Sequence, residues 1–390
     1  MRICLYTESA LPMLGGQELV VDALARSFTA LGHETVVLAP QPRHHLRSSD
    51  EDLPYRVVRH PRFLSTRRFL GWYGHYLTRT YREFPFDVLH CHSVYPTGYI
   101  AARCSAIDDV PVVITSHCGD VCPSSRLLKK PGLPARFSVA LERASASIAI
   151  GRFTEECYRH LCPRIGPIVP IPNGVDVGRF SSLVERPADL KPDIRPAGYF
   201  LFLGSLLHRK GADLQLTSFA MTEGINDLHL VVGGSGSEET ALRRQADRLG
   251  ISDRVHFLGR VDGDTKTWLV QNTLCMVIPS RISEGFPLVL MEAHAAGRPV
   301  IGTCIPGLRD VVCSGQTGLL VPPDSPTELT GALSRMAHDG ELRNRYGAKA
   351  YRMAVKHDWS RVAESHLALF SGLLAGPRAE LGSRSDSHVA

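Results

Sequence analysis

Short apolar strands alternate with helical stretches along nearly the whole chain, and this alternation is interrupted only once. The sequence predicts strands at residues 2–6, 35–39, 56–58, 87–91, 112–116, 146–150 and 168–171, and again at 199–203, 228–232, 255–258, 275–279, 299–302 and 318–321. Helical periodicity is predicted at 18–29, 97–106, 134–144, 154–161, 212–220, 238–249, 266–271, 288–296, 326–337 and 342–355. Strands that alternate with helices form parallel sheets covered on both faces. The sequence therefore predicts an α/β protein with two Rossmann-like units.

The interruption lies at residues 172–198, where Pro187, Pro192 and Pro196 together with several charges are typical of an interdomain linker. We therefore expect one domain at 1–185 and a second at 196–358. A last helical run at 359–374 follows, and the small, polar residues 376–390 are expected to be disordered. Two such units that face each other create a cleft at the carboxyl ends of both sheets.

Composition excludes several classes of protein. No stretch of about 18 apolar residues predicts a membrane span, and the chain enters its first strand without a signal-peptide pattern. Ten cysteines are scattered, and the close pairs Cys118/Cys122 and Cys157/Cys162 do not match a zinc motif. Reduced cysteines in a cytoplasmic protein are the expected arrangement.

The net charge of +5 lies entirely in the first half of the chain. Residues 1–195 hold 24 lysines and arginines against 19 acids, whereas the second half holds 20 of each. Residues 56–82 contain seven arginines and no acid, with aromatic residues between them. This segment suits a solvated or acceptor-binding surface first, and a peripheral contact with an anionic membrane second. It matches no nucleic-acid motif, so no nucleic-acid partner is predicted.

Residues 283–293 carry the most informative motif. They follow a predicted strand and enter an apolar helix, with Glu284 and Glu292 about two helical turns apart and so on roughly the same face. Gly285 allows a close backbone approach, and the amides at a helix N-terminus form an anion site. These groups suit a nucleotide sugar, whose phosphate would bind the amides and whose hydroxyls would donate to the carboxylates.

The string E-G-F-P-L-V-L-M-E-A-x-A-A-G-x-P-V-I, which begins at Glu284, resembles the donor signature of retaining glycosyltransferases of family 4. Members of that family have the GT-B fold. The resemblance implies two Rossmann-like domains that face each other across a cleft, with the C-terminal helix crossing back to the first domain. It also implies a donor site formed by Gly16, Ser205, Gly234, Gly285, Phe286, Pro287, Leu288 and Glu292.

The loop at 204–211 resembles the family's Gly-Arg-x4-Lys-Gly pattern, in which both cations bind the diphosphate. Lys210 matches the lysine, but Ser205 stands where the family has arginine. Either Arg209 compensates or diphosphate binding is weaker. The turn at 232–238 is similar to the family's G-x-G-x-E turn, and it lacks the third glycine of a dinucleotide fingerprint.

The end of the strand at 112–116 resembles the family's H-G-x-D segment, although Cys118 separates His117 from the glycine. By this resemblance, His117 would contact the transferred sugar, and Asp120 and His92 would lie on the acceptor side. His90 and His92 share one face of a strand, but no third ligand is evident, so no metal site is predicted. The D-x-D at Asp262 is expected to be an ordinary helix N-cap.

Together these features predict a metal-independent enzyme without a cofactor. It would move a hexosyl unit, with retention, from a UDP- or GDP-hexose to a hydroxyl acceptor on a glycan, a lipid or a small molecule. The expected catalytic residues are His117, Arg209, Lys210 and Glu284. The expected location is cytoplasmic, with peripheral contact at the inner membrane face left open. Three alternatives remain: a disaccharide phosphorylase, a sugar-nucleotide epimerase and a non-catalytic sugar-nucleotide-binding subunit.

Overall fold

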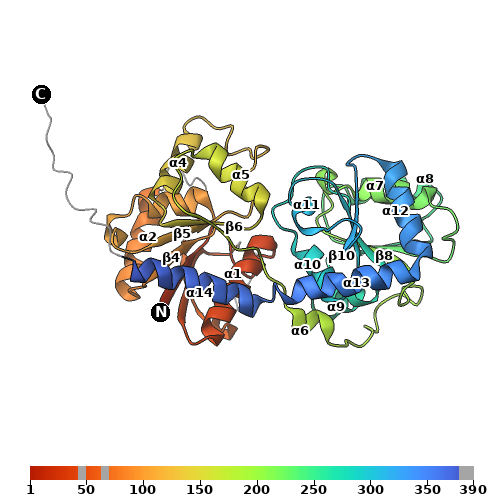
Figure 1. Cartoon of the computed structure of the whole chain (residues 1–390), viewed down its shortest axis with the longest axis horizontal. Coiled ribbons are helices and arrows are strands. Elements are labelled where there is room, and N and C mark those ends of the chain that lie inside the picture. The colour runs from red at the N-terminus through yellow and green to blue at the C-terminus, as the bar shows by residue number, and fades with distance from the viewer. Residues whose placement is uncertain (43–49, 63–69, 377–390) are drawn as a thin grey trace, which may run out of the picture.

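The computed structural model describes residues 1–42, 50–62 and 70–376, which form two α/β domains side by side (Figure 1). The first domain contains a seven-stranded sheet in the order β3-β2-β1-β4-β5-β6-β7, and every strand pairing in it is parallel. Its strands are β1 Arg2–Tyr6, β2 Glu34–Pro40, β3 Arg56–His60, β4 Val88–Cys91, β5 Val112–Thr115, β6 Ala146–Ala149 and β7 Ile168–Pro170. The central strands are almost entirely buried, as a parallel sheet covered on both faces requires.

Helices cover both faces of this sheet. They are α1 Gly16–Ala30, α2 Leu70–Glu83, α3 Tyr99–Ala101, α4 Leu133–Arg143 and α5 Arg152–Leu161. The helix predicted at 97–106 is instead a π-helical turn at Val94–Gly98, the short α3 and a 3-10 turn at Ser105–Ile107. Helix α2 was not predicted, because its apolar residues were interpreted only as part of the basic and aromatic surface segment.

The second domain repeats the plan with a six-stranded parallel sheet in the order β10-β9-β8-β11-β12-β13. Its strands are β8 Tyr199–Leu203, β9 His229–Gly233, β10 Val255–Gly259, β11 Cys275–Ile278, β12 Val300–Thr303 and β13 Gly318–Val321. Its helices are α6 Val177–Ser181, α7 Ala212–Met221, α8 Glu239–Arg248, α9 Gly263–Asn272, α10 Leu288–Ala295, α11 Leu308–Val311, α12 Pro326–His338 and α13 Gly340–Val355. The predicted two-domain α/β architecture is therefore confirmed.

The last helix, α14 Trp359–Ala375, returns to the first domain, where it lies beside α1 (Figure 1). Its residues Val362 and Phe370 are buried with Phe28 of α1 in one hydrophobic cluster. This is the crossing helix that the sequence predicted. Residues 377–390, for which disorder was expected, lie outside the described residues.

The chain passes between the domains twice, and the two passages are hydrogen-bonded to each other. The Val175 N–H donates to the His357 carbonyl at 2.9 Å, and the Trp359 N–H donates to the Val175 carbonyl at 3.2 Å. A Cβ atom at Gly174 would lie 2.6 Å from the Trp359 ring, so glycine is needed here for close approach. Gly174 therefore lets the two passages meet.

The expected linker is partly a packed segment. Phe180, Leu190 and Ile194 are buried in a core cluster of the second domain. The passage between the domains is therefore confined to the few residues around Val175.

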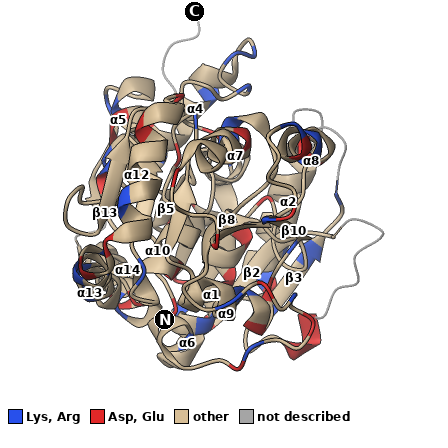
Figure 2. Ribbon diagram, turned by 90° about the vertical axis from the view of Figure 1, so that its right-hand side faces the viewer, with Lys and Arg blue, Asp and Glu red and all other residues tan. Residues whose placement is uncertain are grey.

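Charged residues are spread over the outer helices, where acidic and basic segments lie next to each other on α8 and α13 (Figure 2). On α8, for example, Arg243 pairs with Glu239 one turn away at 2.8 Å. None of the described helices is long and apolar enough to cross a membrane.

Candidate functional site

A cleft of about 1100 Å³ lies between the two domains. Residues from both domains line it, including the start of α1, the loop after β5, the loop after β8 and the segment that leads into α10. These segments follow the carboxyl ends of the strands in both sheets, which is where ligands bind in open α/β folds.

On the second-domain wall, Lys210 and Glu284 form an ion pair. The Lys210 Nζ lies 2.7 Å from Glu284 Oε1, and their side chains are 21% and 11% exposed. The Ser280 hydroxyl donates to the same carboxylate oxygen at 2.7 Å. Both side chains are shielded, and Glu284 is held by Ser280 as well as by Lys210. The Lys210 ammonium is therefore fixed at the surface of the cleft. The sequence did not point to Ser280 as its support.

A second pair lies deeper on the same wall. The Lys266 Nζ on α9 lies 2.6 Å from Glu292 Oε1 on α10, and the two side chains are 17% and 10% exposed. The other oxygen, Glu292 Oε2, is buried and makes no hydrogen bond among the described residues. A buried carboxylate oxygen without a donor is costly, so this atom is suited to accept a hydrogen bond from a ligand hydroxyl.

Lys266 was missed as a site residue, although it lies four positions after Asp262. The sequence analysis considered that segment only as a false metal motif. Asp262 does occupy the N-cap position of α9, but its side chain makes no capping hydrogen bond. No group of three or more metal-ligating side chains gathers within the described ranges.

Arg209, Ser205 and Gly16 also line the cleft. Arg209 is exposed, in contrast to the half-buried Lys210 that follows it. A Cβ atom at Gly16 would meet nothing within 4 Å, so packing does not require a glycine at the start of α1. The open space in front of Gly16 is consistent with its predicted role beside a ligand.

Gly234 does not line the cleft, contrary to its predicted place in the donor site. Its φ of 148° and the proximity of the Gly204 carbonyl leave no room for a side chain. The neighbouring Leu206 N–H donates to the Ser235 carbonyl at 2.9 Å. This glycine therefore lets the turn at 232–238 pack closely against the loop at 204–211.

Gly285 brings the two domains into contact. A Cβ atom built on it would lie 2.9 Å from both the His117 carbonyl oxygen and Cys118 Cβ. Phe286, Pro287 and Leu288 continue along the wall of the cleft, and Leu288 also packs against the hydrophobic cluster that the first domain shares with α14. The close approach predicted for Gly285 is thus made to the opposite domain.

On the first-domain wall, the side chain of His117 is partly exposed in the cleft. Its Nε2 lies 3.1 Å from Nδ1 of His92, and the two rings stack. Burial lowers the pKa of His117 to about 4, so the ring is neutral at pH 7. His92, which was predicted on the acceptor side, is fully buried behind His117 and does not line the cleft.

Asp120 reaches the cleft, but its carboxylate is occupied. It accepts from the Val94 N–H at 2.7 Å and from the Ser116 hydroxyl. Burial raises the pKa of this carboxyl. Asp120 therefore ties the loop after β5 to the segment after β4, and Cys118 within that loop adopts a left-handed φ of 74°.

Glu8 is a further residue of this wall that sequence reasoning missed. It lines the cleft just after β1. Although Glu8 is exposed to the cleft, desolvation by the cleft walls, followed by the nearby Asp120 and Glu18 carboxylates, raises its pKa to about 7. Glu8 is thus placed to form hydrogen bonds as either an acid or a base near neutral pH.

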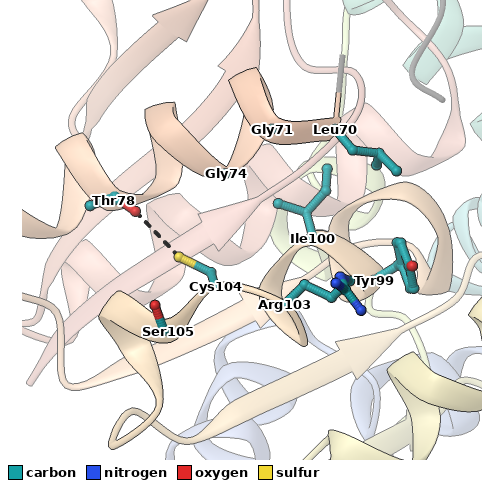
Figure 3. Close-up of a pocket in the computed structure, with 9 residues that line it drawn as sticks. All are labelled: Leu70, Gly71, Gly74, Thr78, Tyr99, Ile100, Arg103, Cys104 and Ser105. Atoms are coloured by element: carbon teal, nitrogen blue, oxygen red, sulfur yellow. Dashed lines mark hydrogen bonds between the residues drawn. The ribbon is translucent and has the colours of Figure 1, made fainter. Parts of the chain in front are cut away.

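A separate, smaller pocket of about 310 Å³ lies in the first domain between α2 and α3 (Figure 3). The Thr78 hydroxyl and the Cys104 thiol are 3.4 Å apart at its edge, and Leu70, Tyr99 and Ile100 contribute apolar surface. None of the residues that line the large cleft takes part in it.

Two parallel-sheet domains, a cleft between them and a helix that crosses back define the GT-B class of fold. Solved structures of other proteins share it, including the following two. Sucrose-phosphate synthase from Thermosynechococcus elongatus has a TM-score of 0.81 at 22% identity and covers 96% of this chain and 99% of its own. HepE from Anabaena, solved in complex with UDP-glucose, has a TM-score of 0.77 at 19% identity, with 95% and 100% covered.

Family models identify the chain more closely. The model for glycosyl transferases group 1 matches residues 193–353, and the model for glycosyltransferase family 4 matches residues 14–179. The chain therefore belongs to the family 4 glycosyltransferases and is a transferase enzyme. A phosphatidyl-myo-inositol mannosyltransferase from Mycobacterium leprae is 28% identical over 386 residues, covering 95% of this chain and 96% of the relative. A glycogen synthase from Mycobacterium tuberculosis is 26% identical over 411 residues, with 97% and 96% covered.

Proposed function

We propose that this glycosyltransferase moves a hexosyl unit from a nucleotide-diphosphate sugar to a hydroxyl acceptor and retains the anomeric configuration. The observation that carries the proposal is the pair of lysine–glutamate contacts on one wall of the cleft, Lys210 with Glu284 and Lys266 with Glu292. In this proposal they supply cations for a diphosphate and carboxylates for hydroxyls near the N-terminal half of α10. The HepE complexes with UDP and with UDP-glucose support the choice of donor.

The donor's diphosphate would lie against Lys210, Arg209 and the first amides of α10. Those amides have no partner within the helix itself, and the helix dipole favours an anion there. Since Ser205 replaces the family's arginine, Lys210 and Arg209 supply the fixed positive charge of this loop. Their charge would stabilise the nucleotide diphosphate as it leaves.

The nucleotide's ribose would bind Glu292. Lys266 holds one carboxylate oxygen at 2.6 Å, which leaves the buried Oε2 to accept a hydrogen bond from a ribose hydroxyl. Glu284, held by Lys210 and Ser280, would contact the hydroxyls of the sugar.

In the reaction, the bond from the anomeric carbon to the phosphate oxygen breaks, and a bond to the acceptor oxygen forms on the same face. The departing phosphate oxygen would take the acceptor's proton. A neutral His117 would hold a sugar hydroxyl or direct its backbone carbonyl towards the developing positive charge. Fixed cations and helix amides would take the place of a metal ion, so no metal or other cofactor is part of the proposal.

The alternatives differ in their products. A disaccharide phosphorylase would release a sugar phosphate from a disaccharide and phosphate. An epimerase would convert the sugar nucleotide without an acceptor, and a non-catalytic subunit would bind nucleotide and turn over nothing.

The test is a thermal-shift panel of UDP, GDP and ADP, followed by product analysis with the corresponding hexose nucleotides. We expect one nucleoside diphosphate to raise the melting temperature, and its hexose derivative to give transfer or slow hydrolysis with the original anomeric configuration. Stabilisation by none of the three, or an inverted product, would contradict the proposal.

We further propose that the acceptor approaches along the first-domain wall, near Glu8 and Asp120. Peripheral contact with an anionic membrane would use α2, on which Trp72 is 57% exposed and Arg82 is exposed. Three other arginines of the basic segment are already paired: Arg56 with Glu83 at 3.5 Å, Arg59 with Asp50 at 2.6 Å and Arg79 with Glu83 at 2.7 Å. Flotation with anionic but not neutral vesicles, lost in Trp72→Ser, is the expected result; equal flotation with both would contradict it.

A further inference from the structure

Two cysteines lie together in the first-domain wall of the cleft. Cys118 and Cys122 both line it, and they are 4% and 7% exposed. The Cys122 thiol lies 3.1 Å from the Ser124 hydroxyl. Neither thiol has a part in the proposed transfer reaction.

The backbone holds these cysteines one turn apart. The Cys122 N–H donates to the Cys118 carbonyl at 3.1 Å, so they are neighbours at positions i and i+4. A disulfide needs Cβ atoms about 3.5–4.5 Å apart. Because a single backbone turn brings the two residues together, a movement within this turn would suffice to join them.

We propose that Cys118 and Cys122 form a reversible thiol–disulfide site that responds to low-molecular-weight disulfides entering the cleft. The Cys122 thiolate attacks one sulfur of the small disulfide, which forms a mixed disulfide and releases one small thiol. Cys118 then loses its proton and attacks the Cys122 sulfur, which releases the second small thiol. Two protein thiols are oxidised to one disulfide, and the small disulfide is reduced to two thiols.

Cys122 is suited to make the first attack. The interaction with Cys118, helped by Ser124, lowers the pKa of the Cys122 thiol to about 6. Because the thiolate is the reactive form of a cysteine, this lowered pKa favours Cys122 over Cys118 as the attacking thiol. Burial raises the pKa of the nearby Cys157 to about 12, so that thiol stays protonated.

The disulfide would act on the site through Gly285. A Cβ atom at Gly285 would lie 2.9 Å from Cys118 Cβ and from the His117 carbonyl oxygen, so the cysteine turn is packed directly against the segment that leads into α10. Drawing Cys118 towards Cys122 moves this contact and the His117 carbonyl together. A shift of about 1 Å in a positioning group is enough to slow an enzyme by up to about a hundredfold.

The test uses the full chain with the two exposed cysteines replaced, Cys304→Ser and Cys313→Ser. After treatment with oxidised glutathione, the tryptic peptide 104–126 should lose the mass of two hydrogen atoms, and fragmentation should place the link between Cys118 and Cys122. Dithiothreitol should restore the mass. In Cys118→Gly, which suits the left-handed φ at that position, Cys122 should instead keep one glutathione.

Cys157→Ser is the matched control, because it removes a neighbouring thiol and should still form the link. A peptide that keeps its mass, or a loss of mass that persists in Cys122→Ser, overturns the proposal. This readout needs no substrate, so it stands apart from any failure of the proposed function. Once a donor is known, the oxidised protein should be less active than the reduced protein, on the order of tenfold to a hundredfold. In Cys122→Ser the ratio of oxidised to reduced activity should stay near one, and a ratio near one in the parent would refute control of activity.

Discussion

Replacing Glu292 by Gln tests the proposed ribose contact with little change in shape. The carboxylate is 8% exposed, with Oε1 bound to Lys266 and Oε2 without a partner among the described residues. In Glu292→Gln the amide oxygen can still accept from Lys266, but the second atom becomes a donor and the negative charge is lost. A ribose hydroxyl would then lose its charged acceptor.

The expected magnitude follows from the strength of that contact. A hydrogen bond to a charged group contributes about 1.5–3 kcal/mol, and a tenfold change in affinity corresponds to about 1.4 kcal/mol. The Kd of the nucleoside diphosphate should therefore rise roughly 10- to 100-fold. Inorganic pyrophosphate has no ribose, so its Kd should change little.

Both ligands can be titrated by calorimetry against the parent protein and the variant. The matched control is Glu239→Gln, because Glu239 forms an ion pair with Arg243 at 2.8 Å in the same domain but on the outer helix α8. That variant should leave both affinities unchanged. An equal loss for nucleotide and pyrophosphate in Glu292→Gln, or no loss for the nucleotide, would refute the ribose assignment.

Three further predictions concern the diphosphate, the metal and the buried histidines. Lys210→Ala should lower kcat/KM by about a hundredfold or more, because it removes charge stabilisation of the leaving group; near-normal kinetics would remove that role. EDTA should leave activity intact, and a loss restored by added Mg²⁺ or Mn²⁺ would show that a metal takes part. Burial lowers the pKa of His366 to about 4. Because this pKa is below the value of about 6.5 in the unfolded chain, protonation of His366 favours the unfolded state. The contribution of His366 to the free energy of unfolding is therefore complete above about pH 6.5 and is lost as the pH falls towards 4, by about 2 kcal/mol between pH 7 and pH 5. The free energy of unfolding at pH 7 and at pH 5 can be measured with denaturant in the parent and in His366→Phe. The drop between the two pH values should be about 2 kcal/mol smaller in the variant; an equal drop in both proteins would contradict the reasoning.

The two-domain fold could be predicted from the sequence because its signals are local. Parallel strands buried on both faces are short apolar runs, and the helices between them show clear periodicity. Helix α2 was missed because glycines and aromatic residues weaken its helical pattern, and it is fixed by packing of Tyr73 and Leu77 into the first-domain core. The segment around Leu190 was read as a linker because proline and charge dominate its composition, although its few apolar side chains are buried in the second domain.

The candidate site was predictable where a motif lies within one element, as with Glu284 and Glu292. It was not predictable where partners come from different elements. Lys266 meets Glu292 across 26 positions, and no spacing rule links α9 to α10. His92 lies at the end of a strand, as many ligand-binding residues do, but whether such a side chain faces the cleft depends on what packs over it, and His117 covers it here.

The contacts between the domains suggest how the segment around Gly285 could both bind the donor and take part in closure of the cleft. Near the crossing point, the passages around Val175 are joined by backbone hydrogen bonds, and α14 is buried in the first domain. Elsewhere Gly285 abuts His117, Leu288 packs against the cluster that the first domain shares with α14, and the Asp310 carboxylate accepts from the Phe153 N–H at 3.1 Å. A hydrogen bond of this last kind contributes only about 1.5–3 kcal/mol, so we expect the domains to part at Gly285 more easily than at the crossing segments. Gly285 lies in the segment that leads into α10, where the diphosphate is proposed to bind, and it also contacts the first domain. Donor binding would therefore be coupled to closure of the two domains.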